Sequence, residues 1–125
     1  AIDPASAADQ RAELELIHYL NSIGFSCVRS ASSGNFLYPI DIVAIKKGLT
    51  IAIESKNYAK KPRPDKTQLS QMSEWCAKAG AIGLVGWRTP ESKWLFLRLE
   101  DAVNGNYEDE NWMERDVLIK VLDFR

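Results

Sequence analysis

The sequence contains one histidine and two cysteines among its 125 residues. His18 has no histidine or cysteine partner at a metal-binding spacing, and it lies on a predicted helix, so catalysis by a Ser-His-Asp group is not expected. Cys27 and Cys76 are far apart and lack zinc-type spacing, which favours reduced thiols in an intracellular protein. No apolar run approaches the roughly 18 residues that a membrane span requires, and no signal peptide is visible. We therefore expect a cytoplasmic protein with no membrane partner.

The composition is that of an ordinary globular protein, with 46% apolar and 26% charged residues. Repeats and low-complexity segments are absent, and the length suits about one domain with a substantial core. We expect one domain over residues 8–125. Residues 1–7 lack an initiator methionine and are expected to be a leader or an expression remnant.

The net charge of −1 conceals an uneven distribution of charge. Residues 46–66 contain seven basic and two acidic side chains, whereas residues 100–116 contain seven acidic and one basic. Nucleic-acid binding requires a local basic surface and not a basic total. A solvated loop would explain the basic run equally well by itself, but its position directly after a candidate active site favours phosphate contact. The candidate contacts are Lys60, Lys61, Arg63 and Lys66.

Hydrophobic periodicity and turn residues predict two helices and five strands. The helices are expected at residues 8–23 and 65–79, and the strands at residues 25–30, 40–46, 49–55, 81–87 and 93–99. Residues 104–110 are predicted to form a loop, and residues 117–122 a short strand or helix. This order predicts an α/β fold with a central mixed five-stranded sheet flanked by helices.

Asp41, Glu54 and Lys56 form the pattern D-x12-E-x-K across a predicted hairpin. Lys47-Gly48 suits a two-residue turn, and this turn would place Asp41 directly opposite Glu54. Opposed residues of an antiparallel pair have Cβ atoms about 4.5–5.5 Å apart, and Lys56 follows on the same face. A cross-strand salt bridge is the structural alternative, but two acids for one base leave a surplus negative charge.

A divalent cation would balance this surplus charge. Mg2+ prefers carboxylate oxygens, and a metal held by Asp41 and Glu54 could activate water and neutralise charge on a phosphate. The backbone carbonyl of Ser55 could add a ligand. Lys56 could orient or deprotonate the water, or stabilise the pentacovalent phosphate. The pattern therefore indicates a metal-dependent nuclease.

Two further charged residues are candidates for this site. Glu13 lies on the helical row of Leu16 and Leu20, where a carboxylate is costly unless it is paired or metal-bound. Arg29 ends the next predicted strand and precedes a Ser-rich loop, which suits contact with a phosphate. An ion pair between Glu13 and Arg29 is the structural alternative.

The ordered motifs resemble those of the archaeal-type Holliday junction resolvases, which belong to the restriction-endonuclease-like nuclease superfamily. The motifs are E-L-E-L-I from Glu13, G-F from Gly24, R-S-A-S-S from Arg29, D-I-V-A from Asp41 and I-E-S-K from Ile53. The resemblance runs from about residue 9 to residue 97.

The resemblance implies a restriction-endonuclease-like core and a homodimer that cleaves four-way DNA junctions with Mg2+, which Mn2+ could replace. It implies paired symmetric nicks that leave 5′-phosphate and 3′-hydroxyl ends. The family positions fall on Glu13, Arg29, Asp41, Glu54 and Lys56. Ser32 or Ser33 would approach the cut strand, and Gln68 matches a glutamine after the sheet. The family often has a basic residue where this chain has Leu14, and Arg11 is the candidate substitute.

Three alternatives remain open from the sequence. The protein could be another nuclease of the same superfamily, acting in restriction, repair or nicking. It could be a DNA-binding module with an inactive site, or a structural protein whose acids pair with Lys56 and Arg29. The strand at residues 81–87 and the helix carrying Trp75 are candidates for the dimer interface.

Overall fold

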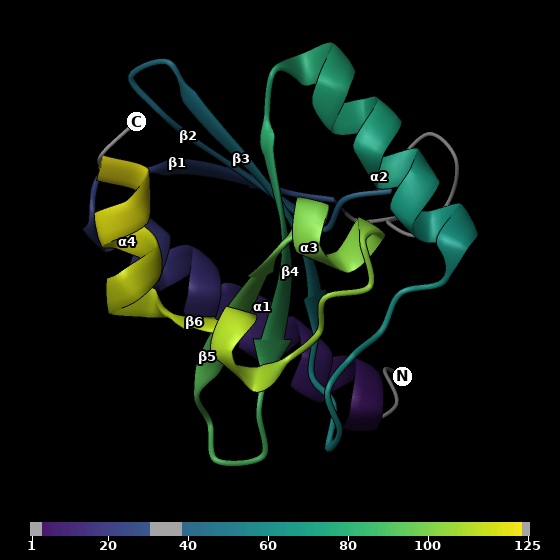
Figure 1. The fold of residues 1–125 in the computed structure, drawn as a ribbon. Coiled ribbons are helices and arrows are strands. Elements are labelled where there is room, and N and C mark those ends of the chain that lie inside the picture. Colours follow the sequence, from purple (N-terminus) through teal and green to yellow (C-terminus); the bar gives the residue numbers. More distant parts are fainter. Residues whose placement is uncertain (1–3, 31–38, 124–125) are drawn as a thin grey trace.

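The structure of the protein is a computed structural model that describes residues 4–30 and 39–123. Its strands form one mixed sheet in chain order (Figure 1). The strands are β1 (Ser26–Arg29), β2 (Ile42–Lys46), β3 (Leu49–Lys56), β4 (Ile82–Arg88), β5 (Trp94–Arg98) and β6 (Met113–Glu114). The prediction of an α/β fold with a mixed sheet is confirmed. The predicted strand number was one too low, because β6 has only two residues.

Helices cover both faces of the sheet (Figure 1). They are α1 (Pro4–Ser22), α2 (Lys66–Ala79), α3 (Leu99–Val103) and α4 (Arg115–Asp123), with a 3-10 turn η1 (Asp109–Asn111). One buried cluster joins α1 and α4 to the sheet through residues such as Leu16, Ile53 and Leu118. A second cluster joins α2 and α3 to the opposite face through Met72, Val85 and Leu99. The sheet is therefore buried on both faces.

The hairpin between β2 and β3 has the predicted register. Lys46 pairs with Leu49, and Ile42 pairs with Ile53. Lys47 and Gly48 have φ angles of 42° and 86°, the left-handed conformations that a two-residue type I′ turn requires. This turn fixes which side chains reach the open end of the hairpin.

Strand β3 also pairs in parallel with β4, and α2 forms the crossover between them. Asp65 caps α2 by accepting a hydrogen bond from the Gln68 amide at 2.8 Å. Gly80 ends the helix with a φ of 66°, a conformation that suits glycine. The predicted capping residues of α2 are thus confirmed. Helix α2 begins directly beside the end of β3 that carries the candidate site.

Other parts differ from the prediction. Helix α1 begins at Pro4, four residues before the expected start, and α3 was not predicted. Residues 117–122 are helical within α4. Strand β4 lies inside the sheet with its middle residues buried, and a dimer interface through it or through the helix carrying Trp75 stays a prediction. None of the helices in the described ranges is long and apolar enough to cross a membrane.

Candidate active site

A cleft of about 550 Å3 lies where α1, the end of β3 and the first turn of α2 meet. Six candidate residues from the sequence line it, and they come from four separate segments of the chain. They are Glu13, Asp41, Glu54, Ser55, Lys56 and Gln68. The fold thus brings together the acids, the lysine and the glutamine, although up to 55 positions separate them in the sequence.

Asp41 is fixed at the open end of the hairpin. Its amide donates to the carbonyl of Ile53 at 3.0 Å, which continues the ladder one residue beyond β2. Its Oδ2 accepts hydrogen bonds from the amide and the hydroxyl of Ser55, at 2.7 and 3.3 Å. Asp41 is 7% exposed, and these bonds hold its carboxylate beside the residue that follows Glu54.

Glu54 is the most deeply buried acid of the cleft, with a side chain 3% exposed. Its Oε1 forms an ion pair with Nζ of Lys56 at 2.9 Å. Its Oε2 is buried and has no hydrogen-bond partner in the part of the chain that the structure describes. A buried carboxylate oxygen without a partner is costly, and a bound cation would remove that cost.

The buried position of Glu54 shifts the pKa of its carboxyl group. Burial raises the pKa of Glu54 to about 7, and the nearby Asp41 carboxylate adds to the rise. Lys56 and Gln68 act in the opposite direction and do not cancel the effect. The site therefore holds two carboxylates that repel each other, one of them far from water.

The pKa of Lys56 is also shifted by burial and by the neighbouring acids. Burial lowers the pKa of Lys56, but Glu54, Tyr58 and Asp41 together raise it by more, so the net shift is upward. Its ammonium group also lies 5.8 Å from the centre of the Tyr58 ring. Lys56 thus places a positive charge inside the cleft, directly beside the two acids.

Glu13 reaches the cleft from α1. Its Oε1 lies 3.4 Å from Nε of Arg29, so the ion pair considered as the structural alternative is present. Burial raises the pKa of Glu13, Asp41 raises it further, and Arg29 lowers it. Glu13 is therefore both paired with Arg29 and exposed to the negative potential of Asp41.

The donor set suits a hard divalent cation. Carboxylate oxygens of Asp41 and Glu54 face the same cleft, and Mg2+ is commonly held by one or two carboxylates while it retains several waters. Within the described residues, no three Asp, Glu, His or Cys side chains are close enough to form a complete protein ligand set. The residues thus fit a metal that keeps water ligands, with the orphaned Oε2 of Glu54 as the clearest sign.

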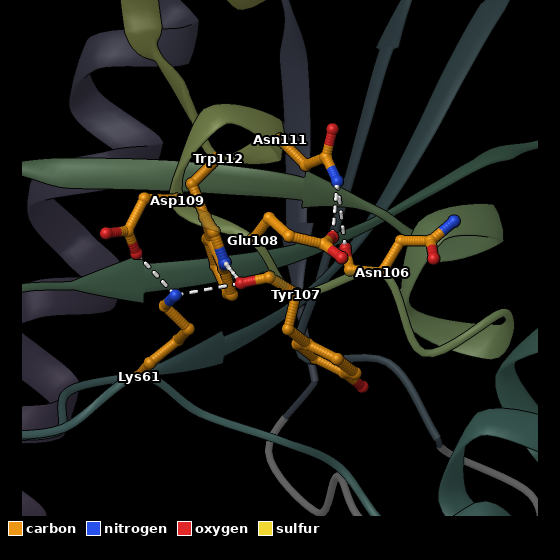
Figure 2. Close-up of polar contacts among 7 residues, drawn as sticks. All are labelled: Lys61, Asn106, Tyr107, Glu108, Asp109, Asn111 and Trp112. Atoms are coloured by element: carbon orange, nitrogen blue, oxygen red, sulfur yellow. Dashed lines mark hydrogen bonds and ion pairs between the residues drawn. The ribbon is translucent and has the colours of Figure 1, made fainter.

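The predicted DNA contacts divide into two groups. Arg11, Lys60 and Lys66 are exposed. Lys61, which is half-buried, and Arg63, which is also exposed, contact the C-terminal part of the chain, as Figure 2 shows for Lys61. Ser32 and Ser33 lie outside the described residues.

The cleft also contains residues that the sequence analysis missed. They are Asp9, Ala12, Asn57, Tyr58, Asp65, Thr67, Gln71 and Trp94. Asp9 precedes Glu13 by one helical turn, and this i, i+4 spacing could have identified it. Tyr58 is 49% exposed although it is a large aromatic residue. Thr67 and Gln71 carry no sequence signal of their own, because α2 brings them to the cleft only in the folded chain.

Comparisons with known proteins identify the family of the chain. A family model described as archaeal Holliday junction resolvase (Hjc) matches residues 6–121. The chain belongs to the archaeal Holliday junction resolvase family. Among solved structures it is similar to Hjc of Archaeoglobus fulgidus, a Holliday junction resolvase from an archaeal hyperthermophile. The two share 26% sequence identity, the match covers 74% of each chain, and the TM-score is 0.64. A comparison with curated proteins gave no match.

Membership of this family confirms the expected restriction-endonuclease-like architecture and the expected class of enzyme, an endonuclease. Nucleases of the resolvase family depend on metal ions. The family match extends to residue 121, so it includes the acidic C-terminal segment that the sequence resemblance left out.

Proposed function

We propose that this resolvase-family protein is a Mg2+-dependent endonuclease that cuts four-way DNA junctions by paired symmetric nicks, with Mn2+ able to replace Mg2+. One observation carries the proposal: Asp41 and the orphaned carboxylate oxygen of Glu54 line one cleft beside Lys56. This arrangement occurs in a chain of the resolvase family. We further propose that it acts in the cytoplasm.

The proposed roles follow from the cleft. Asp41 and Glu54 would hold the metal, with the carbonyl of Ser55 as a further ligand and Glu13 as an outer carboxylate. A bound metal would lower the pKa of a water ligand and neutralise charge on the scissile phosphate. Lys56 would place its positive charge against the same phosphate. Hydrolysis would leave 5′-phosphate and 3′-hydroxyl ends.

The proposed DNA contacts lie around the cleft. Arg11, Lys60 and Lys66 are exposed and would contact phosphates, which makes binding strongly salt-dependent. Gln68 lines the cleft at the start of α2 and would approach the cut strand, as would Arg29, Ser32 and Ser33. Selectivity would come from the branched shape of the DNA and from backbone contacts more than from base edges.

A homodimer would suit this substrate. A four-way junction has twofold symmetry, so two subunits related by a twofold axis would present one cleft to each of two opposite strands. The paired nicks would then be symmetric and ligatable.

The test compares cleavage of an immobile four-way junction with cleavage of a linear duplex of the same arm sequence. We expect junction cleavage that requires Mg2+ or Mn2+ and yields nicks that DNA ligase seals. Asp41→Asn should lower the rate by about 100-fold or more, the scale for losing one electrostatic stabiliser of a transition state. Lys78→Gln, which removes an exposed lysine paired with Glu74 on α2, is the matched control and should cleave normally.

Two results would count against the proposal. Preference for the linear duplex would assign the protein to another nuclease activity of the superfamily. Full activity of Asp41→Asn would show that catalysis does not use this cleft.

A further inference from the structure

The segment that follows the proposed catalytic lysine is fastened to the C-terminal part of the chain. We name residues 57–65 the strap; it leads from β3 to α2 and lines the cleft through Asn57 and Tyr58. The indole N–H of Trp87 donates to the carbonyl of Tyr58 at 2.9 Å. Further along the strap, Nζ of Lys61 donates to the carbonyl of Tyr107 at 2.8 Å. The strap is therefore held at two points along its length.

Arg63 adds a third attachment. Its guanidinium group lies 4.5 Å from the centre of the Tyr107 ring, a distance at which a cation is attracted to an aromatic face. Lys61 also forms an ion pair with Asp109 (Figure 2). Two cations that the sequence assigned to DNA thus contact a neutral tyrosine and the acidic C-terminal region.

The partner of Lys61 lies in a buried, hydrogen-bonded turn. Tyr107 and Trp112 are 8% and 7% exposed, and the indole N–H of Trp112 donates to the same Tyr107 carbonyl at 3.3 Å. The Asn111 amide bonds to the carbonyl of Asn106 at 3.3 Å and to the carboxylate of Glu108 at 3.0 Å (Figure 2). These bonds fold residues 104–112, which we name the anchor, into a fixed acceptor for Lys61.

The anchor also packs against β4, which holds the strap through Trp87. Trp112 packs edge to face against Trp87, with ring centroids 5.5 Å apart. Trp87 is paired with Lys56 in the parallel register of β3 and β4, and it holds the carbonyl of Tyr58. A continuous set of contacts therefore connects the anchor to the residues beside Lys56.

We propose that Lys61 is a positioning residue: through the carbonyl of Tyr107 it fixes the strap so that Asn57 and Tyr58 keep their places beside Lys56, and it does not contact DNA phosphates. This inference rests on the proposed nuclease function. It assigns the acidic C-terminal region a role as the support of one wall of the active site.

The two acceptors of Lys61 should contribute unequally. The side chain of Asp109 is 95% exposed, whereas that of Lys61 is 32% exposed. Ion pairs in water contribute little, so the buried carbonyl of Tyr107 provides most of the attachment. Loss of Asp109 should accordingly matter much less than loss of Lys61.

The experiment measures kcat, KM and the salt dependence of junction binding for Lys61→Met. We expect kcat to fall by roughly tenfold or more, because small displacements of a positioned group have large effects on rate. KM and the salt slope should change little, since no phosphate contact is lost. Lys61→Arg should recover most of the activity, because arginine can still donate to the carbonyl. Lys78→Met is the control for removal of an exposed lysine and should behave as wild type.

A second variant tests the anchor without altering a charge. Asn111→Ala removes the bonds to Asn106 and Glu108, and it leaves the strap intact. It should also lower kcat with little change in KM. Amide hydrogen exchange of the strap, measured without DNA, should be faster in both Lys61→Met and Asn111→Ala than in wild type. This readout does not depend on cleavage.

Three outcomes would overturn the inference. An unchanged kcat with a raised KM, and a salt slope smaller by about 0.9, would identify Lys61 as a phosphate ligand. Tighter junction binding by Asp109→Asn would indicate that the anchor competes with DNA for Lys61. Unchanged exchange of the strap in Lys61→Met would show that Lys61 does not fasten it. Failure of the wild type to cleave junctions would instead contradict the proposed function, and the exchange measurement would still test the strap.

Discussion

Replacement of Glu54 by glutamine should stabilise the metal-free protein at alkaline pH. Burial and Asp41 raise the pKa of Glu54 from its usual 4.5 to about 7. At about 1.4 kcal/mol per pH unit, this rise corresponds to about 3 kcal/mol of destabilisation once the group is ionised in both the folded and the unfolded state. Glutamine removes that cost, which is a net cost because the pKa of about 7 already includes the favourable ion pair with Lys56.

We therefore expect Glu54→Gln to gain about 3 kcal/mol of unfolding free energy at pH 8, or roughly 10 °C in Tm for a domain of this size. The size of this gain depends on pH. Below 4.5 the carboxyl group is protonated in both states, so the stabilisation by glutamine should vanish. Between pH 4.5 and 7 the folded state holds the proton more tightly than the unfolded chain, and wild-type stability should fall as the pH rises.

Thermal and urea denaturation in EDTA at pH 4 and pH 8 measure this effect. Glu74→Gln removes an exposed carboxylate on α2 and is the matched control, with an expected change within about 0.5 kcal/mol. Saturating Mg2+ should stabilise wild type by about 2.7 kcal/mol at 100 times Kd, and Glu54→Gln by much less. The reasoning is refuted if Glu54→Gln is less stable than wild type at pH 8, or if its gain is equal at both pH values.

Three other predictions follow from particular contacts. The apparent Mg2+ affinity of wild type should increase as the pH rises to about 7 and then level off, because Glu54 must lose its proton to bind the ion; calorimetry across this range checks it, and a flat profile would contradict it. Asp65→Ala should lose about 0.5–2 kcal/mol of stability by removing the cap of α2, whereas Asp65→Asn should lose little in the same denaturation assay. Gly83→Ala should lose about 1–3 kcal/mol through overpacking, since its new Cβ would lie 2.6 Å from Cδ2 of Leu99; an unchanged Tm would mean that α3 moves freely away from β4.

The hairpin and α2 could be predicted from the sequence because local chemistry determines them. Lys47-Gly48 selects one turn type, and that turn fixes the position of Asp41 relative to Glu54. Asp65 and Gly80 likewise mark both ends of α2. In these segments each residue has its main partner within a few positions or directly across a tight turn.

The C-terminal region could not be predicted because its elements are short. Helix α3 has five residues and no side-chain cap, and β6 has two residues. Periodicity cannot identify elements of this length. Five of the six residues in 117–122 are apolar, a pattern that is compatible with a strand or a helix. Only the packing of Leu118 and Leu122 against the face of the sheet that α1 covers favours the helix.

The basic run after Lys56 illustrates a different limit. Sequence position grouped Lys60, Lys61 and Arg63 as equivalent phosphate ligands, yet Lys61 pairs with Asp109, 48 positions away. A charge pattern identifies cations but not their partners. The acidic run at the C-terminus was visible in the same sequence, and its contact with the basic run could be inferred only from the folded chain.

The two acids of the cleft are chemically unequal, and the inequality follows from the hairpin register. Asp41 lies one residue beyond the last ladder pair, where its Oδ2 accepts from the Ser55 amide and is satisfied by the protein. Glu54 lies on the paired strand with Oε2 buried and without a partner among the described residues. Asp41 is thus held in place before any ligand arrives, whereas Glu54 has a carboxylate oxygen that is free to bind a cation. Burial of this unpaired oxygen destabilises the metal-free fold. The same oxygen therefore makes Glu54 the more favourable metal ligand of the two acids.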